Sequence, residues 1–414
     1  MVNILEEKNK KNKKLKLPKL LDINNKKFKT EKDKKEITTK TVNKFKVAVV
    51  VLVVLLLTAI AAAQFGGVTF STVADYVVTA IARIGAGDGY PYQVSGDPII
   101  DAAVSKSDVV LLYDDSVKIL NSTAKELSDL PHDYDHPKLK TNSGRVLLYE
   151  QGGKKLRVQS KTRVLYEKEM ENIIYAAAIG KDGTVAVATR ASNAETMLTV
   201  FDSKQKAVFI WECGNEFIIS CDVSDNGKYF VVSAMGVKNG AEYSKVHIFN
   251  KKESSAVATF QYDSAITSVE FLSNETVMVM GKSVCEIIKE GQVSQKIDVS
   301  VHTPSKLFIS DNNTAILVLS RYSSTTQKII KVYNKAGEEL FSTEIDGLVK
   351  SVSTDGKYIA VLTDKNVQIF NQKGEMTGFT PVNADAGKVL VSSRNTYVYS
   401  TDRVDQYSSV EILK

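Results

Sequence analysis

The chain alternates short apolar runs with polar turns in a pattern that recurs along most of its length. In residues 353–374, "STDGKYIAVLTDKNVQIFNQKG", a turn leads to an apolar run, a second turn, an alternating run and a third turn. Two of the intervals between alternating runs are about twice the others, and weaker copies ending at Ser160 and Lys289 fill them; a last weak copy, "TYVYS", ends at Ser400. The pattern therefore predicts eight units of about 40 residues. The five clearest alternating runs end at Asn121, Asp202, Asn250, Asn334 and Asn371.

A second marker, a polar turn followed by a fully apolar run, gives the same number of units. Several of these turns contain Asp-Gly or Asn-Gly, which tolerate positive φ and close tight hairpins. A run that is apolar on both faces is typical of an interior strand, and alternation is typical of a strand nearer an edge. The pattern predicts an all-β fold, a single β-propeller of eight four-stranded blades, with seven blades as the alternative. A solenoid has a similar period but needs polar capping units, and we find none.

The last blade of such a ring is usually completed by strands from both ends of the domain. The segments "PYQVSG" at Pro91 and "SSVEILK" at Ser408 are our candidates for this closure. The propeller is therefore expected to span residues 91–414.

The segment before the propeller has two unlike parts. Residues 1–46 contain 16 lysines and six acidic residues, a net charge of +10, whereas the rest of the chain is −4. We expect this Lys-rich tail to be disordered and cytoplasmic; an arm that binds anionic lipid or nucleic acid is the alternative. Residues 47–66 begin "VAVVVLVVLLLTAIAAA" and predict a transmembrane signal-anchor helix. Because lysines crowd its N-terminal side, the propeller should be extracytoplasmic; cleavage after Ala63 is the alternative.

Residues 67–90 connect the predicted anchor to the propeller. Val73, Val77 and Ile81 recur at fourfold spacing and predict a short amphipathic helix, either at the membrane surface or packed under the propeller. The glycines that follow are typical of a linker. Their segment "IGAGDGY", which begins at Ile84, lacks the spacing of a dinucleotide-binding loop.

One short stretch has the residue types of a metal site. In "PHDYDHP", residues 131–137, His132, Asp133, Asp135 and His136 could in principle hold zinc or a similar ion. Prolines at both ends disfavour the helix that would align them. We therefore interpret the stretch as an exposed connector between blades.

The remaining polar residues give little sign of catalysis. His247 occupies a variable, outward position of the repeat, and His302 has no partner motif. Trp211 is the only tryptophan, unlike the tryptophan-rich propellers that hold quinone cofactors, and Asp114 and Asp115 lie in a turn. We predict no catalytic, cofactor-binding or metal-binding residues. Three cysteines lie in apolar strand-like runs and are expected to be buried thiols: Cys213, Cys221 and Cys285.

From about Val47 to the C-terminus, the chain resembles a family of membrane-anchored propeller proteins of unknown function from Gram-positive bacteria. The phrases "YEQGGK" and "SVSTDGKYIAVL" carry the resemblance most specifically. More distantly, the blades are similar to WD-repeat and outer-membrane assembly propellers, which serve as binding platforms. The resemblance implies a propeller and a binding role, with no activity to transfer.

We expect a non-enzymatic binding or scaffolding module that is tethered to the cytoplasmic membrane and contacts a protein or cell-envelope component. Propeller loops provide many side chains for recognition without a nucleophile or base. An extracytoplasmic lyase, hydrolase or quinoprotein-like oxidoreductase is the alternative, and the negative charge of the body disfavours nucleic acid. The two longest hairpins, in blades four and six, provide the candidate partner-binding residues: Lys238, Asn239, Glu242, Tyr243, Arg321 and Tyr322.

Overall fold

The computed structural model describes residues 50–51, 53–55, 77–94, 97–321 and 327–409. The chain divides into two compact units, residues 1–77 and 78–414. In the first unit, the described residues of the predicted anchor are helical, and the rest of the anchor and the Lys-rich tail lie outside the described residues. Within the described part of the chain, no helix is both long and apolar enough to cross a membrane.

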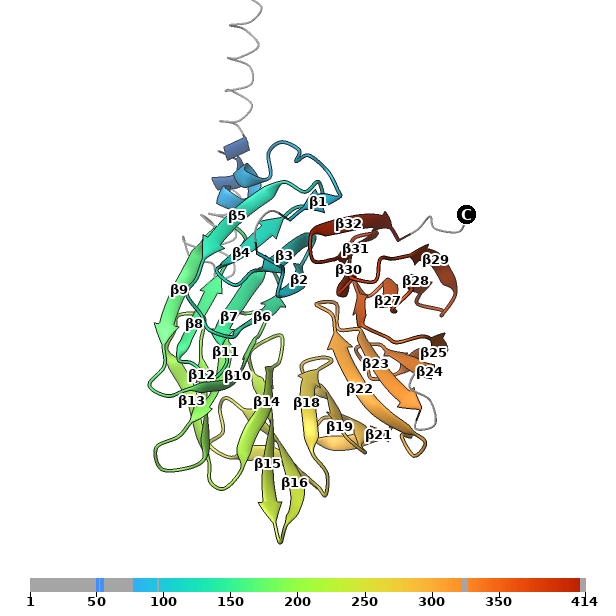
Figure 1. Cartoon of the computed structure of the whole chain (residues 1–414). Helices are drawn as coiled ribbons and strands as arrows, with labels where there is room; N and C mark the ends of the chain where they lie inside the picture. The colour runs from blue at the N-terminus through green and yellow to red at the C-terminus, as the bar shows by residue number, and fades with distance from the viewer. Residues whose placement is uncertain (1–49, 52, 56–76, 95–96, 322–326, 410–414) are drawn as a thin grey trace, which may run out of the picture. The chain divides into compact units, whose positions relative to one another are not determined.

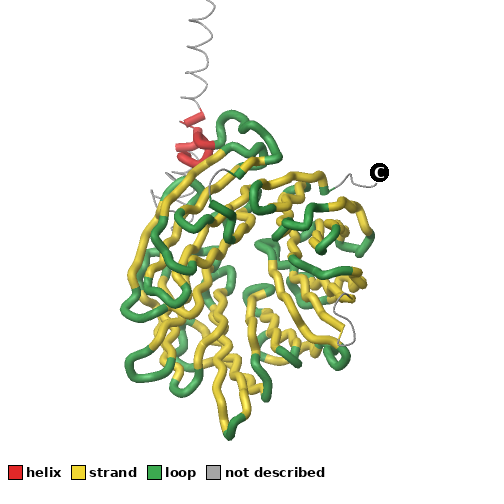
Figure 2. The backbone as a smooth tube through the Cα atoms, viewed as in Figure 1, coloured by secondary structure: helices red, strands yellow, loops and turns green. Residues whose placement is uncertain are grey.

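The second unit is built from eight antiparallel sheets of four strands each, arranged as a propeller (Figure 1). Figure 2 shows that strands and short loops make up nearly all of this unit, with helix only before the first strand. The prediction of eight blades is thus confirmed. Blades one to four contain β2 (Asp101–Ser105), β3 (Asp108–Leu112), β4 (Ser116–Leu120), β5 (Glu126–Pro131); β6 (Pro137–Asn142), β7 (Arg145–Glu150), β8 (Lys155–Gln159), β9 (Val164–Glu169); β10 (Ile174–Ile179), β11 (Val185–Arg190), β12 (Thr196–Phe201), β13 (Ala207–Cys213); and β14 (Phe217–Val223), β15 (Tyr229–Lys238), β16 (Ala241–Asn250), β17 (Ala256–Tyr262).

The other four blades repeat this plan. They contain β18 (Ile266–Phe271), β19 (Thr276–Gly281), β20 (Cys285–Lys289), β21 (Gln292–Lys296); β22 (His302–Ile309), β23 (Ala315–Arg321), β24 (Gln327–Tyr333), β25 (Glu339–Asp346); β26 (Ser351–Thr354), β27 (Tyr358–Leu362), β28 (Asn366–Asn371), β29 (Met376–Pro381); and β30 (Lys388–Ser392), β31 (Asn395–Tyr399), β32 (Arg403–Ser408) with β1 (Tyr92–Gln93).

Blade eight closes the ring with strands from both ends of the domain. β1 pairs with β32, with Tyr92 opposite Val404, so Tyr92 and Gln93 of the "PYQVSG" candidate form the outer strand. The C-terminal candidate "SSVEILK" contributes only Ser408 to a described strand, because β32 lies upstream and residues 410–414 lie outside the described residues.

The position of "TYVYS" within blade eight differs from our prediction. In the other blades the alternating run is the third strand, but "TYVYS" belongs to β31, the second strand, and the apolar run before it is the innermost strand, β30. The reason is the closure itself. Because β1 occupies the outer place, the last three strands of the chain take the three inner places.

Each strand of a blade has the burial that its sequence predicts. The second strand β27 is buried at every position, whereas the outer strand β17 alternates between half-buried and exposed residues. Among the described residues, eight hydrophobic clusters bridge the eight junctions between neighbouring blades. Side-chain burial between blades is therefore what holds the sheets in a ring.

The Asn or Asp that ends each clear repeat has a local role. In all five repeats its side-chain oxygen accepts the backbone N–H group two residues later, and in all but Asn250 it also accepts the one four residues later, as Asn371 does from Lys373 at 2.9 Å and from Glu375 at 3.1 Å. Asp202 makes the same pair of bonds with Lys204 and Lys206. An Asx turn of this kind fixes the connection to the outer strand, which explains why these residue types recur.

The short helix before the propeller is present, but Ile81 does not pack under the propeller, which was one of our two alternatives for its apolar face. Residues 77–82 are helical. Ile81 is 56% exposed, and Ala82 instead packs against the cluster between blades one and two. Polar contacts fix this arrangement: Lys125 Nζ donates to the Ala82 carbonyl oxygen at 2.6 Å, and Arg83 forms an ion pair with the buried Asp108.

Candidate functional site

The predicted hairpin of blade four forms a two-stranded ribbon that extends past the rest of its sheet (Figure 1). β15 and β16 have ten residues each, and we call residues 236–243 the ribbon. The neighbouring strands stop short of it, because β14 begins opposite Met235 and β17 ends opposite Ser244. The three pairs from Gly236–Tyr243 to Lys238–Ala241 therefore lack a third strand on either side among the described residues.

A two-residue turn at the tip determines the register of the ribbon. Asn239 and Gly240 have φ values of 54° and 79°, the paired positive values of a type I′ turn. This turn matches the twist of the two strands, and Asn-Gly is the sequence that favours it most. The sequence therefore predicted this hairpin correctly.

The base of the ribbon is anchored on one side by Glu216. Its Oε1 accepts hydrogen bonds from the Tyr243 hydroxyl at 2.9 Å and from Lys245 Nζ at 2.6 Å. Burial opposes ionisation of Glu216, but these bonds outweigh burial and hold its pKa below the ordinary value. The ring of Tyr243 covers Gly236 so closely that a Cβ there would lie 2.7 Å from it.

The other face of the ribbon is open to solvent and carries Val237 opposite Glu242. Val237 is 72% exposed, and Phe217, which lies on the same face two positions along, is 45% exposed. The predicted contact residues Lys238, Asn239 and Glu242 are also exposed at the tip. The ribbon therefore combines an apolar patch with charged and polar side chains.

The predicted residues of blade six do not join those of blade four. Arg321 ends β23 and donates to Gln327 Oε1 at 3.1 Å across its own hairpin, and blade five separates the two hairpins. Tyr322 lies outside the described residues. Only the blade-four residues therefore form one described surface.

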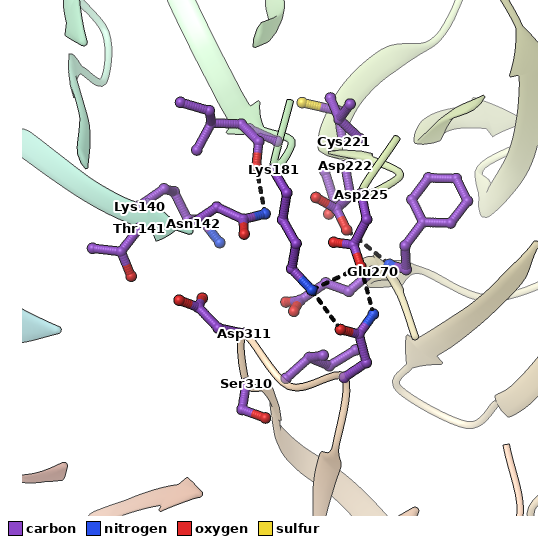
Figure 3. Close-up of a pocket in the computed structure, with 17 residues that line it drawn as sticks. Lys140, Thr141, Asn142, Lys181, Cys221, Asp222, Asp225, Glu270, Ser310 and Asp311 are labelled. Atoms are coloured by element: carbon purple, nitrogen blue, oxygen red, sulfur yellow. Dashed lines mark hydrogen bonds and ion pairs between the residues drawn. The ribbon is translucent and has the colours of Figure 1, made fainter. Parts of the chain in front are cut away.

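A second candidate site, which the sequence did not reveal, lies in the central channel (Figure 3). The first strands of neighbouring blades contact one another and form the channel wall. A cavity of about 140 Å³ lies at the end where the first strand of each blade turns into the second. Six charged side chains line it: Lys140, Lys181, Asp222, Asp225, Glu270 and Asp311.

Contacts between blades hold one side of the cavity. Lys181 Nζ, from the turn after β10, lies 2.8 Å from Asp225 Oδ2 and 2.7 Å from Asn313 Oδ1. Asn313 Nδ2 in turn donates to Asp225 Oδ2 at 3.0 Å. Blades three, four and six are thus joined across the channel by one hydrogen-bonded group (Figure 3).

Asp222 and Glu270 place two neighbouring carboxyl groups in the channel wall, and each influences the pKa of a nearby group. The backbone N–H of Phe271 donates to Asp222 Oδ2 at 2.7 Å. Burial, and then the nearby carboxylate of Glu270, raise the pKa of Asp222 to about 7. Glu270 also raises the pKa of Lys140, which keeps that ammonium charged.

A larger cavity of about 510 Å³ adjoins the first and is lined by blades one, two, three, six, seven and eight. The two cavities share five lining residues: Thr141, Lys181, Ile309, Ser310 and Asp311. Hydroxyl side chains, including those of Ser143 and Thr354, make up much of its lining.

The residues of "PHDYDHP" have separate partners. His132 Nε2 lies 3.2 Å from the Tyr113 carbonyl oxygen, and Asp133 pairs with Lys155 at 2.6 Å on the surface. Asp135 and His136 are exposed. Within the described ranges, no three His, Cys, Asp or Glu side chains form a group that could hold a metal ion.

The isolated histidines and cysteines also have structural surroundings. His247 Nδ1 lies 2.9 Å from the Thr259 hydroxyl, and its ring lies 5.0 Å from Trp211. His302 lies at the start of β22. All three cysteines are buried free thiols, as predicted, and burial raises the pKa of each.

The sequence carried one signal for the channel residues. Asp222 in "SCDVS" and Glu270 in "SVEFL" each place an acid inside a mostly apolar first strand. Burial of an ionisable group is costly unless it has partners or a function. The acidic pair considered from the sequence, Asp114 and Asp115, is instead exposed in the turn between β3 and β4.

The family model described as "Family of unknown function (DUF5711)" matches residues 96–407, nearly the whole propeller. The chain belongs to this family. No match was found among curated proteins. The match explains the shared blade phrases but brings no activity.

Solved structures resemble the propeller in fold. The C-terminal WD40 domain of Sif2 matches with a TM-score of 0.56 at 14% identity, covering 77% of this chain and 98% of that domain. The β-propeller domain of Cps50 (Swd1) from Myceliophteria thermophila gives 0.47 at 9% identity, with 77% and 99% covered. BamB from Moraxella catarrhalis gives 0.38 at 14%, with 65% and 96% covered. Only the first of these scores supports the fold assignment.

Proposed function

We propose that this member of the family is a non-enzymatic binding or scaffolding propeller. An uncleaved N-terminal anchor tethers it to the cell membrane, the N-terminus is cytoplasmic, and the propeller lies on the extracytoplasmic side. Its partner is a protein that contacts the ribbon of blade four. The membrane part of the proposal is supported by the apolar run of residues 47–66 and the lysines before it.

The extension of the ribbon beyond its own sheet is the observation that carries the binding role. Its backbone edge past Met235 has no neighbouring strand among the described residues, and such an edge can pair with a strand of another chain. The exposed Val237 and Phe217 would give an added strand an apolar contact on one face. Lys238 and Glu242 at the tip would select the partner by charge.

A single labelling experiment tests the binding surface and the sidedness together. The variant Glu242→Cys places a thiol on the exposed tip, and the three native cysteines are buried. Intact cells expressing the full-length protein are treated with a membrane-impermeant maleimide that carries a photo-crosslinker. We expect labelling from outside the cell and, after illumination, a discrete adduct with one partner protein.

The matched control is Asp114→Cys, which exposes a thiol in a turn of blade one. It should be labelled equally well but should not give that adduct. Absence of labelling at both positions in cells, with labelling after lysis, would contradict the extracytoplasmic location. Labelling at both positions with identical adducts, or with none, would contradict recognition by the ribbon.

A further inference from the structure

The channel cavity has the size of a small organic ligand. Its volume is about 140 Å³, and residues from blades two to six line it. An engineered cavity of about 150 Å³ in another protein holds benzene, so this volume suits roughly six non-hydrogen atoms. The lining differs from that apolar case, because most of the residues in Figure 3 are polar or charged.

Two buried acceptors in the lining have no hydrogen-bond donor among the described residues. Asn142 Nδ2 donates to the Ile179 carbonyl oxygen at 3.0 Å, which fixes the amide orientation and leaves its Oδ1 unpaired. Asp311 Oδ2 is unpaired as well, although backbone N–H groups of Ser143 and Lys106 interact with the same carboxylate. Lys181 donates to Asp225 and Asn313 and makes no hydrogen bond to either of the two unpaired acceptors. A ligand that donates hydrogen bonds would satisfy both atoms.

The charge of the lining favours a cationic donor. Four carboxylates, those of Asp222, Asp225, Glu270 and Asp311, stand against the two ammonium groups of Lys140 and Lys181. When all six groups are ionised, the cavity is left with two negative charges. Water would satisfy the acceptors but would leave this charge in place, whereas a dication would do both.

A bare metal ion fits the lining less well than an organic cation. Calcium takes about six to eight oxygen ligands at close range. In the part of the chain that the structure describes, no three acidic, imidazole or thiol groups converge closely enough to hold a metal. An ammonium group has three N–H donors and bonds its acceptors at ordinary hydrogen-bond distance, so it does not need ligands that converge as closely as those of a metal ion.

We propose that the channel cavity binds a short aliphatic diammonium compound. One ammonium group donates to Asp311 Oδ2 and Asn142 Oδ1, and the other lies beside Asp222 and Glu270. The site is independent of the ribbon, because the ribbon forms the opposite end of β15 and shares none of these residues.

The affinity is expected to depend on pH through Asp222. The groups that face it are Glu270 on β18, Lys140 on β6, the backbone N–H of Phe271, and the Cys221 thiol on its own strand. Burial raises the pKa of Asp222 to about 7, so the carboxylate is mostly protonated at pH 6 and mostly ionised at pH 8. A dication prefers the ionised form. Binding should therefore be about tenfold tighter at pH 8 than at pH 6.

Calorimetric titration of the full-length protein with 1,4-diaminobutane tests the proposal. This probe has the required size and charge, and 1,4-butanediol is its uncharged counterpart. We expect saturable binding of the diamine, no binding of the diol, and the tenfold pH effect. Asp311→Asn and Asp222→Asn should each weaken binding, and Asp222→Asn should also reduce the pH effect.

The control Asp114→Asn removes a carboxylate from an exposed turn and should leave the titration unchanged. The pH effect is measured on the wild-type protein, so it does not depend on whether a variant folds. Equal binding of the diol, no heat at millimolar diamine, or wild-type affinity in both channel variants would overturn the proposal. Tighter binding of zwitterionic alanine than of the diamine would overturn the assignment of a dication.

Discussion

Blade four carries the channel cavity and the ribbon at opposite ends of one strand. β15 starts at Tyr229, near the turn that carries Asp225, and ends at Lys238 beside the ribbon tip, a path of about 30 Å at the usual rise per residue. Side chains from five blades meet at the cavity, whereas the ribbon consists of two adjacent strands. The cavity is a product of ring closure, and the ribbon is a product of local pairing.

This difference determines which contacts each surface depends on. The cavity residues are tied to neighbouring blades, for example through the Phe271 N–H to Asp222. The ribbon is tied to its own blade through Glu216, and its other face is open. Changes at the ribbon should therefore stay local, while changes in the core between the two ends should reach both.

The largest effect is expected for Phe249→Ala, in the core of blade four. Phe249 is fully buried, with its ring 5.2 Å from that of Phe209 and 4.9 Å from that of Trp211. Its loss should reduce the free energy of unfolding by about 3 to 5 kcal/mol, because it leaves a cavity between blades three and four. Urea unfolding of the full-length protein measures this.

The matched control is Val257→Ala in β17, where the side chain is largely exposed. Its effect should be within about 0.5 kcal/mol. Equal destabilisation by the two variants would show that the contact between blades three and four does not hold the two ends of blade four together.

A smaller and more local effect is expected for Glu216→Ala. The change leaves the Tyr243 hydroxyl and Lys245 without their shared acceptor. The cost should be about 1 to 3 kcal/mol. Hydrogen exchange should become faster at the ribbon amides and should stay unchanged at the Phe271 amide in the cavity wall.

The control for this variant is Glu242→Ala, which removes an exposed carboxylate from the ribbon without touching its anchor. It should leave exchange unchanged throughout. Faster hydrogen exchange in the cavity wall of Glu216→Ala would mean that the two ends of blade four are coupled, and would contradict the expectation that changes at the ribbon stay local.

The parts of the fold that depend on neighbouring residues could be predicted from the sequence. The Asx turns after Asp202 and Asn371 recur because the hydrogen bonds of each turn lie within five residues. The repeat and the number of blades could therefore be predicted. The Asn239-Gly240 turn could be predicted for the same reason. The position of β31 as second strand could not be predicted, because it depends on β1, from the other end of the domain, forming the outer strand of blade eight.

The channel could not be predicted because its residues are far apart in the sequence. Asn142 and Asp311 are brought to one cavity only by closure of the ring. Fourfold spacing likewise could not decide whether Ile81 packs under the propeller, and Ala82 packs against the blades instead, where Lys125 and Arg83 make polar contacts. The sequence of one blade's innermost strand does not indicate which strands of the other blades lie opposite it in the channel.

The smallest effect is expected for Gly236→Ala, at the start of the ribbon. A Cβ at this position would lie 2.7 Å from the ring of Tyr243, so the ring must move and its hydrogen bond to Glu216 weakens. Because the ring is half-exposed and can turn outward, the free energy of unfolding should fall by about 1 kcal/mol, at the low end of overpacking.

Gly214→Ala is the control, since nothing lies within 4 Å of its added Cβ. In thermal unfolding, Gly236→Ala should have a lower midpoint temperature than Gly214→Ala. Hydrogen exchange in Gly236→Ala should become faster only at the amides of the ribbon. Equal behaviour of the two variants would show that the ring of Tyr243 does not hold the ribbon in place.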